Sequence, residues 1–74
     1  MNSNRDEKVL EVRTNDDGTY EVSWNRQLFR SRVEQRWLND VLCVALGFCG
    51  KEYEAIVLQL NATGKAIVRL PPLP

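Results

Sequence analysis

Apolar and polar residues alternate in the first third of the chain. The period of two appears in residues 8–14, KVLEVRT, and again in residues 19–24, TYEVSW. Such alternation is typical of a strand with one face toward water. The intervening residues 15–18, NDDG, tolerate tight turns. The pattern therefore predicts a β-hairpin over residues 8–24, and it leaves open whether Trp24 lies in the core or in a contact surface.

A helical period follows an ambiguous segment. Residues 25–30, NRQLFR, fit a strand, a loop or the start of a helix. The next four residues, SRVE, match a capping box with Ser31 as N-cap and Glu34 at N3. Beyond it, apolar residues recur at helical spacing: Val33, Trp37, Val41, Ala45 and Phe48, with Leu38, Leu42 and Leu46 beside them. We predict a first helix from Ser31 to a glycine stop at Gly47 or Gly50.

A second helix and a final strand complete the predicted fold. Residues 51–64, KEYEAIVLQLNATG, have apolar positions at helical spacing, two glutamates in the first turn, and Gly64 as a stop signal. Residues 66–70, AIVRL, predict a short strand that the following prolines end. The expected architecture is a small α+β domain of order β-β-α-α-β. It has a three-stranded, mostly antiparallel sheet with two helices packed on one face.

Length and composition indicate one small soluble domain. The chain has 74 residues, of which 43% are hydrophobic. We expect a disordered tail over residues 1–7, a single domain over 8–70, and a proline-rich tail over 71–74. The polar start does not resemble a signal peptide, and the longest apolar run is too short to cross a bilayer. The expected location is therefore cytoplasmic.

The two cysteines give little basis for a metal site or for catalysis. The chain has no histidine, and two thiols alone do not complete a tetrahedral metal site. We expect free thiols, no cofactor and no metal, with Cys43 as a small core residue. Cys49 lies near the predicted start of the second helix, where a thiol can become reactive, and this is a minor hypothesis. No motif for acid–base or phosphate chemistry is present, and the protein is not expected to be an enzyme.

The uncharged run VLCVALGFC, residues 41–49, predicts a contact surface. It is apolar on every side of a helix, whereas the sheet and the second helix can cover only two sides. Burying a large aliphatic side chain is worth about 1.5–3 kcal/mol, so an uncovered side favours a second copy or a foreign protein. The alternative is that the small core closes around the run unaided. The predicted interface residues are Trp37, Val41, Leu42, Leu46 and Phe48.

An arginine cluster supplies a second hypothesis. Four arginines lie near flat aromatic residues, and single-stranded nucleic acid is bound by this combination of charge and stacking. The candidate nucleic-acid-binding residues are Arg26, Arg30, Arg32, Arg36 and Trp24. The formal net charge is zero. This favours the other interpretation, in which the arginines form a solvated helix edge and the aromatic residues beneath them belong to the core. The sequence thus predicts a non-enzymatic regulator or inhibitor that acts by protein–protein interaction as a homodimer, with nucleic-acid binding as the alternative.

Overall fold

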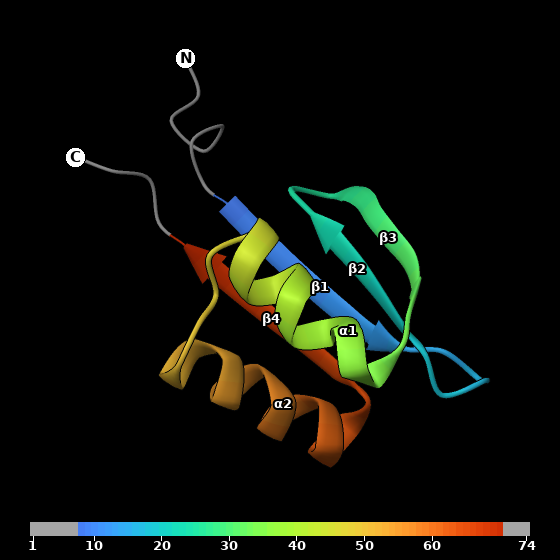
Figure 1. Cartoon of the computed structure of the whole chain (residues 1–74). Coiled ribbons are helices and arrows are strands. Elements are labelled where there is room, and N and C mark those ends of the chain that lie inside the picture. Colours follow the sequence, from blue (N-terminus) through green and yellow to red (C-terminus); the bar gives the residue numbers. More distant parts are fainter. Residues whose placement is uncertain (1–7, 71–74) are drawn as a thin grey trace.

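The computed structural model of the protein describes residues 8–70, and these form an antiparallel sheet and two helical segments (Figure 1). In chain order the elements are β1 (Lys8–Thr14), β2 (Tyr20–Trp24), β3 (Gln27–Val33), α1 (Gln35–Asn39), the π-helix η2 (Asp40–Ala45), α2 (Lys51–Thr63) and β4 (Lys65–Leu70). The predictions of terminal tails over 1–7 and 71–74 lie outside the described residues.

The N-terminal hairpin expected from the alternating pattern is confirmed. Strands β1 and β2 pair antiparallel, with Val12 opposite Val22. Strand β4 pairs antiparallel with the other side of β1, so that Ala66 also lies opposite Val12 and Leu70 lies opposite Lys8. These register positions place the apolar side chains of three strands on the same face of the sheet.

Residues 27–33 form a fourth strand, which corrects the predicted three-stranded sheet. Strand β3 pairs antiparallel with β2 at the edge, and the strand order is β3-β2-β1-β4. Ser31 lies inside β3, so the predicted capping box with Glu34 does not form, and α1 begins directly after Glu34. The strand prevails because β2 offers backbone partners and because Val33, at the end of β3, is buried.

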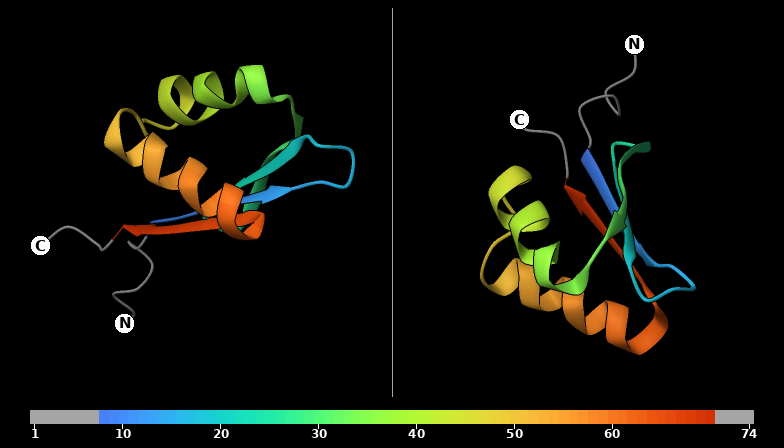
Figure 2. Two further views of the ribbon diagram at one scale, coloured as in Figure 1. Left: turned by 90° about the horizontal axis from the view of Figure 1, so that it is seen from below. Right: turned by 45° about the vertical axis from the view of Figure 1, so that its right-hand side comes forward.

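Both helical segments cover one face of the sheet (Figure 2). The core between the two layers consists of Leu10, Val12, Val22, Val33, Leu38, Leu42, Phe48, Ile56, Leu60 and Ala66. No polar or charged residue in the described part of the chain is buried. The α+β class with two helical segments is therefore confirmed, and its core is held by apolar contact alone.

The first helical segment changes from α-helix to π-helix at Asp40. Its inward leucines, Leu38, Leu42 and Leu46, are spaced by four residues, whereas an α-helix has 3.6 residues per turn. A wider turn keeps this spacing on one side of the helix. Accordingly Leu38 and Leu42 are buried, and Leu46 packs against the core. The segment ends at Ala45 with Leu46 as its C-cap, and Gly47, one of the two predicted stops, follows with a φ of 88°.

The second helix and the last strand agree with the sequence pattern. Helix α2 covers residues 51–63 and buries Ile56 and Leu60. Gly64 follows in the left-handed conformation, and its amide donates to the Leu60 carbonyl at 2.8 Å. Strand β4 begins at Lys65, one residue before the predicted start.

A two-residue turn joins β2 to β3. Asn25 and Arg26 have φ values of 55° and 68°, which is the pattern of a type I′ hairpin turn. The Asn25 side chain accepts a hydrogen bond from the Val9 amide at 3.0 Å and so ties the turn to β1. Type I′ turns favour glycine at their second central position, whereas this chain has an arginine there.

Replacing Arg26 by glycine should stabilise the protein. The left-handed conformation costs a side-chain-bearing residue about 1–2 kcal/mol, and glycine recovers this at an entropic cost of about 0.4–1 kcal/mol. We expect a net gain of roughly 0.5–1 kcal/mol in the free energy of unfolding, measured by urea denaturation. Arg26→Ala, which removes the charge but keeps the backbone strain, is the control and should show no such gain. A less stable Arg26→Gly variant would contradict this account of the turn.

Candidate functional site

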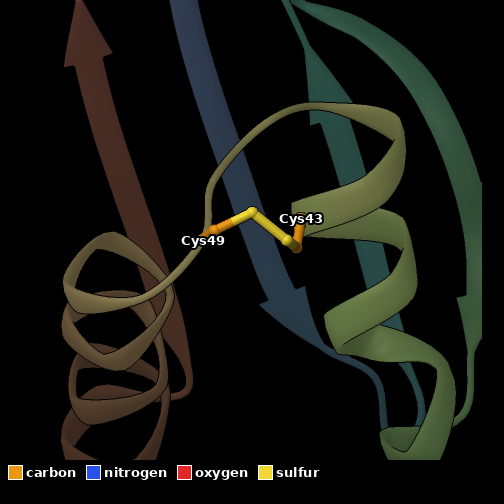
Figure 3. Close-up of a disulfide and its surroundings, with 2 residues drawn as sticks. All are labelled: Cys43 and Cys49. Atoms are coloured by element: carbon orange, nitrogen blue, oxygen red, sulfur yellow. A yellow bond between two sulfur atoms is a disulfide. The ribbon is translucent and has the colours of Figure 1, made fainter.

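Cys43 and Cys49 form a disulfide, which corrects the expectation of free thiols (Figure 3). Cys43 lies on η2 and Cys49 lies in the loop before α2, and their Cα atoms are 4.6 Å apart. The turn at Gly47 brings the two residues together, and a spacing of six residues does not reveal this in the sequence. Cys43 is half-buried rather than a core residue. The hypothesis of a reactive Cys49 thiol is wrong for this oxidised form, because neither cysteine is free.

The predicted interface residues divide between the core and the surface. Leu42 is 0% exposed and Phe48 is 3% exposed, so both belong to the core, which corrects their assignment as contact residues. Leu42 is inward because η2 turns this side toward the sheet, whereas Phe48 lies in the following loop and packs against Trp24. Val41 and Leu46 are half-buried and pack against the core. Trp37, by contrast, is 51% exposed.

An exposed valine extends the outward side of this segment. Val44 is 79% exposed, and it was not among the residues that the sequence pattern selected. α-Helical spacing could not have identified it, because η2 is a π-helix whose wider turn offsets Val44 from Val41. We call Trp37, Val41 and Val44 the apolar stripe.

The loop that follows η2 is anchored in the core by Phe48. Its ring packs edge-on against Trp24, with centroids 5.7 Å apart and planes at 73°. Trp24 is half-buried on β2, so it lies at the margin of the core. Much of the uncharged run 41–49 is thus covered internally, by the sheet, by Phe48 and by the disulfide, and Val44 is the large apolar side chain left outside.

The arginines are spread along an edge of the sheet rather than gathered in one patch. Arg26 is in the β2–β3 turn, and Arg30 and Arg32 are on β3. At about 3.3 Å per strand residue, Arg26 and Arg32 lie roughly 20 Å apart along the strand. Arg36 lies on α1, where its Nε is 2.9 Å from Glu34 Oε1. Because Arg32 is on a strand and Arg36 on a helix, the two arginines do not share one helix face.

Each aromatic ring near these arginines already has a neighbour within the protein, and Trp37 alone of the three is as much as half exposed. The Arg30 guanidinium lies 4.3 Å from the centroid of the Phe29 ring, and Arg36 lies 5.6 Å from that of Trp37. Trp24 is engaged with Phe48. A single-stranded nucleic-acid surface needs rings that are open to bases, so this geometry favours the solvated edge.

Asp17 shapes the β1–β2 turn. Its Oδ1 accepts hydrogen bonds from the Thr19 hydroxyl at 2.6 Å and from the Thr19 amide at 3.0 Å. These two bonds hold the pKa of Asp17 below its ordinary value, and Arg32 adds a smaller effect in the same direction. Asp17 is therefore a turn-forming residue, as its place in the sequence indicated.

Both edges of the sheet are protected against pairing with another strand. On β4, Gln59 of α2 accepts a hydrogen bond from the Ile67 amide at 3.3 Å, and the Thr63 hydroxyl donates to the Lys65 carbonyl at 2.9 Å. On the other edge, the β2–β3 register shifts twice, and β3 carries two arginines. Bulges and positive charges of this kind disfavour edge-to-edge association.

The uncovered face of the sheet is largely polar. Glu11 makes ion pairs with Arg13 at 3.6 Å and with Lys65 at 3.5 Å, across β1 and β4. Among the described residues, no group of three or more His, Cys, Asp or Glu side chains could hold a metal ion. Within residues 8–70, no helix is long and apolar enough to span a membrane.

Comparison with known proteins found no matching family model, no matching curated protein and no matching solved structure.

Proposed function

We propose that this protein acts by binding another protein through the apolar stripe, and that the partner is a second copy of the chain. The supporting observation is Trp37, which is half exposed on a helical segment that Leu38 and Leu42 fix in the core. Tryptophan is enriched among the residues that dominate protein interfaces. The proposal assigns no residue a catalytic role. It also retains the cytoplasmic location that the sequence predicted.

The alternative surfaces for association are less suitable. Both edges of the sheet are protected against pairing with another strand. Side chains of α2 cover the β4 edge, and bulges and arginines protect the β3 edge. The uncovered face of the sheet carries ion pairs that association would have to desolvate. The stripe residues themselves form no ion pair and are apolar except for the indole N–H of Trp37, and their charged neighbour is Arg36, which lies over the Trp37 ring and pairs with Glu34.

A two-fold dimer suits a stripe that lies along one helical segment. In an isologous interface each copy presents the same surface, so two segments can lie side by side and cover one another. Burying one large apolar side chain is worth about 1.5–3 kcal/mol, and each stripe residue contributes twice in such a dimer. The alternative function is nucleic-acid binding through the arginines, and the experiment below can also detect it.

Replacing Trp37 by serine should abolish self-association and leave the fold intact. We expect light scattering after size exclusion to give the mass of two chains for the wild-type protein and of one chain for Trp37→Ser. The substitution removes two Trp37 side chains per dimer, and a hot-spot loss of about 2 kcal/mol for each corresponds to a dimer Kd raised roughly 1,000-fold. Far-UV circular dichroism should be unchanged, because the side chain is half exposed already.

Leu58→Ser is the matched control. Leu58 is 69% exposed on α2 and lies outside the stripe, so its replacement should leave the dimer intact. A wild-type mass of one chain at all concentrations, or equal losses in both variants, would contradict the proposal. Nucleic acid co-purifying with the protein, seen as a raised 260/280 nm absorbance ratio that falls on Arg→Gln replacement along β3, would favour the alternative.

A further inference from the structure

The disulfide lies beside the apolar stripe. Figure 3 shows the disulfide joining Cys43 on η2 to Cys49 in the following loop. Cys43 directly precedes Val44, and Cys49 is exposed. Exposed disulfides are the ones that thiols can reduce most readily, and in the cytoplasm disulfides are characteristically transient and redox-sensing. We propose that the Cys43–Cys49 disulfide is a redox switch for the apolar stripe. This inference rests on the proposed function, because it concerns the regulation of the same surface.

The disulfide adds a covalent constraint to a loop that contains two glycines. Residues 46–50 include Gly47 and Gly50, both with positive φ, and glycine loses the most conformational freedom when it is ordered. Three backbone hydrogen bonds hold the loop to η2. The Leu46 and Gly47 amides donate to the Cys43 carbonyl, the latter at 2.9 Å, and the Phe48 amide donates to the Leu42 carbonyl at 2.7 Å. The Phe48 ring against Trp24 is the main apolar anchor. Without the covalent link, these contacts alone must offset the entropy of the loop.

Opening of the loop would disorder part of the apolar stripe, because the loop stabilises the last turn of η2. The carbonyls of Leu42 and Cys43 lie near the end of the segment, where helical carbonyls have no partner inside the helix. The loop amides supply those partners in the oxidised form. When the loop opens, the carbonyls lose them, and the adjacent turn, which carries Val44, frays. Association must then order this turn again. The free energy of ordering it reduces the affinity of the dimer.

The chemical step is a thiol–disulfide exchange with a dithiol reductant. A reductant thiolate attacks one sulfur, for which exposed Cys49 is the accessible position, and the sulfur of Cys43 leaves as a thiolate. The second thiol of the reductant then resolves the mixed disulfide. The products are two protein thiols and one reductant disulfide. Two electrons and two protons pass to the protein.

Reduction of the full chain with dithiothreitol tests the switch. We expect two titratable thiols, amide hydrogen exchange at least 10-fold faster in residues 43–50, and unchanged exchange in β1 and β2. The dimer Kd, from light scattering over a dilution series, should rise at least 10-fold. Cys43→Ser/Cys49→Ser should reproduce these values without reductant. Dithiothreitol should have no further effect on that variant, which shows that the reductant acts through this disulfide.

Three outcomes would overturn the switch. The first is a disulfide that dithiothreitol does not reduce in the folded protein. The second is faster loop exchange with an unchanged dimer Kd. The third is loss of exchange protection throughout the sheet, which would make the disulfide a requirement for folding. A one-chain mass for the oxidised protein would instead contradict the proposed function, while the exchange rates would still report whether the disulfide controls the loop.

Discussion

Replacement of Leu42 by alanine is expected to lower the free energy of unfolding by about 3–4 kcal/mol. The side chain is fully buried between η2 and the sheet, so its removal leaves a cavity lined by core residues. A domain of this size has a total stability of roughly 4–11 kcal/mol, so the variant should lose a large part of it. Urea denaturation followed by tryptophan fluorescence measures the difference, with the slope of the transition unchanged.

Val44→Ala is the matched control on the same helical segment. Its side chain is mostly exposed, and its truncation should change stability by no more than about 0.5 kcal/mol. The two variants together test which side of η2 faces the sheet. Equal losses, or a larger loss for Val44→Ala, would show that this segment is rotated relative to the structure described above.

Removal of the disulfide is expected to lower the free energy of unfolding by about 2 kcal/mol. The link closes a ring of about seven residues, and the loop-entropy relation gives roughly 2.4 kcal/mol for that length. For a domain of this size such a loss lowers the melting temperature by roughly 8–16 °C. Thermal melts of Cys43→Ser/Cys49→Ser and of the oxidised wild-type protein measure the shift.

The reduced wild-type protein provides the control for this variant. If the serine substitutions act only by removing the link, reduced wild-type protein and the variant should melt at the same temperature. A variant that melts with the oxidised protein would mean that the link adds nothing to stability. The switch requires a moderate loss, because the reduced domain must stay folded while its loop opens.

The sequence pattern predicted the elements whose signals are local. The hairpin is marked by strict alternation around NDDG, and α2 is marked by helical spacing and by Gly64. The sequence pattern did not predict β3, because NRQLFRSRV has no clear period. The apparent capping box indicated the start of a helix, whereas the segment pairs with β2. An edge strand with two register shifts does not keep the alternation that identifies a strand. The fourth strand therefore depends on tertiary pairing.

The candidate site was predicted only in part for a related reason. Periodicity grouped the apolar residues of the first helix, but it does not state which group faces the sheet. Leucines spaced by four residues fit the π-helix better than an α-helix, and this moved Leu42 inward and left Val44 outside. The disulfide depends on a turn between the cysteines, and the spacing in the sequence carries no sign of that turn.

The pairing of β1 with β4 has a consequence for joining this domain to other chains. Lys8 lies opposite Leu70, so the first and last described residues are neighbours across one rung of the ladder, about 5 Å apart at Cα. Entry and exit points this close allow a domain to sit within a host protein as an insertion, with little strain on the host. The same proximity suits circular permutation, in which a short linker closes residues 70 and 8 and the β1–β2 turn provides the new ends.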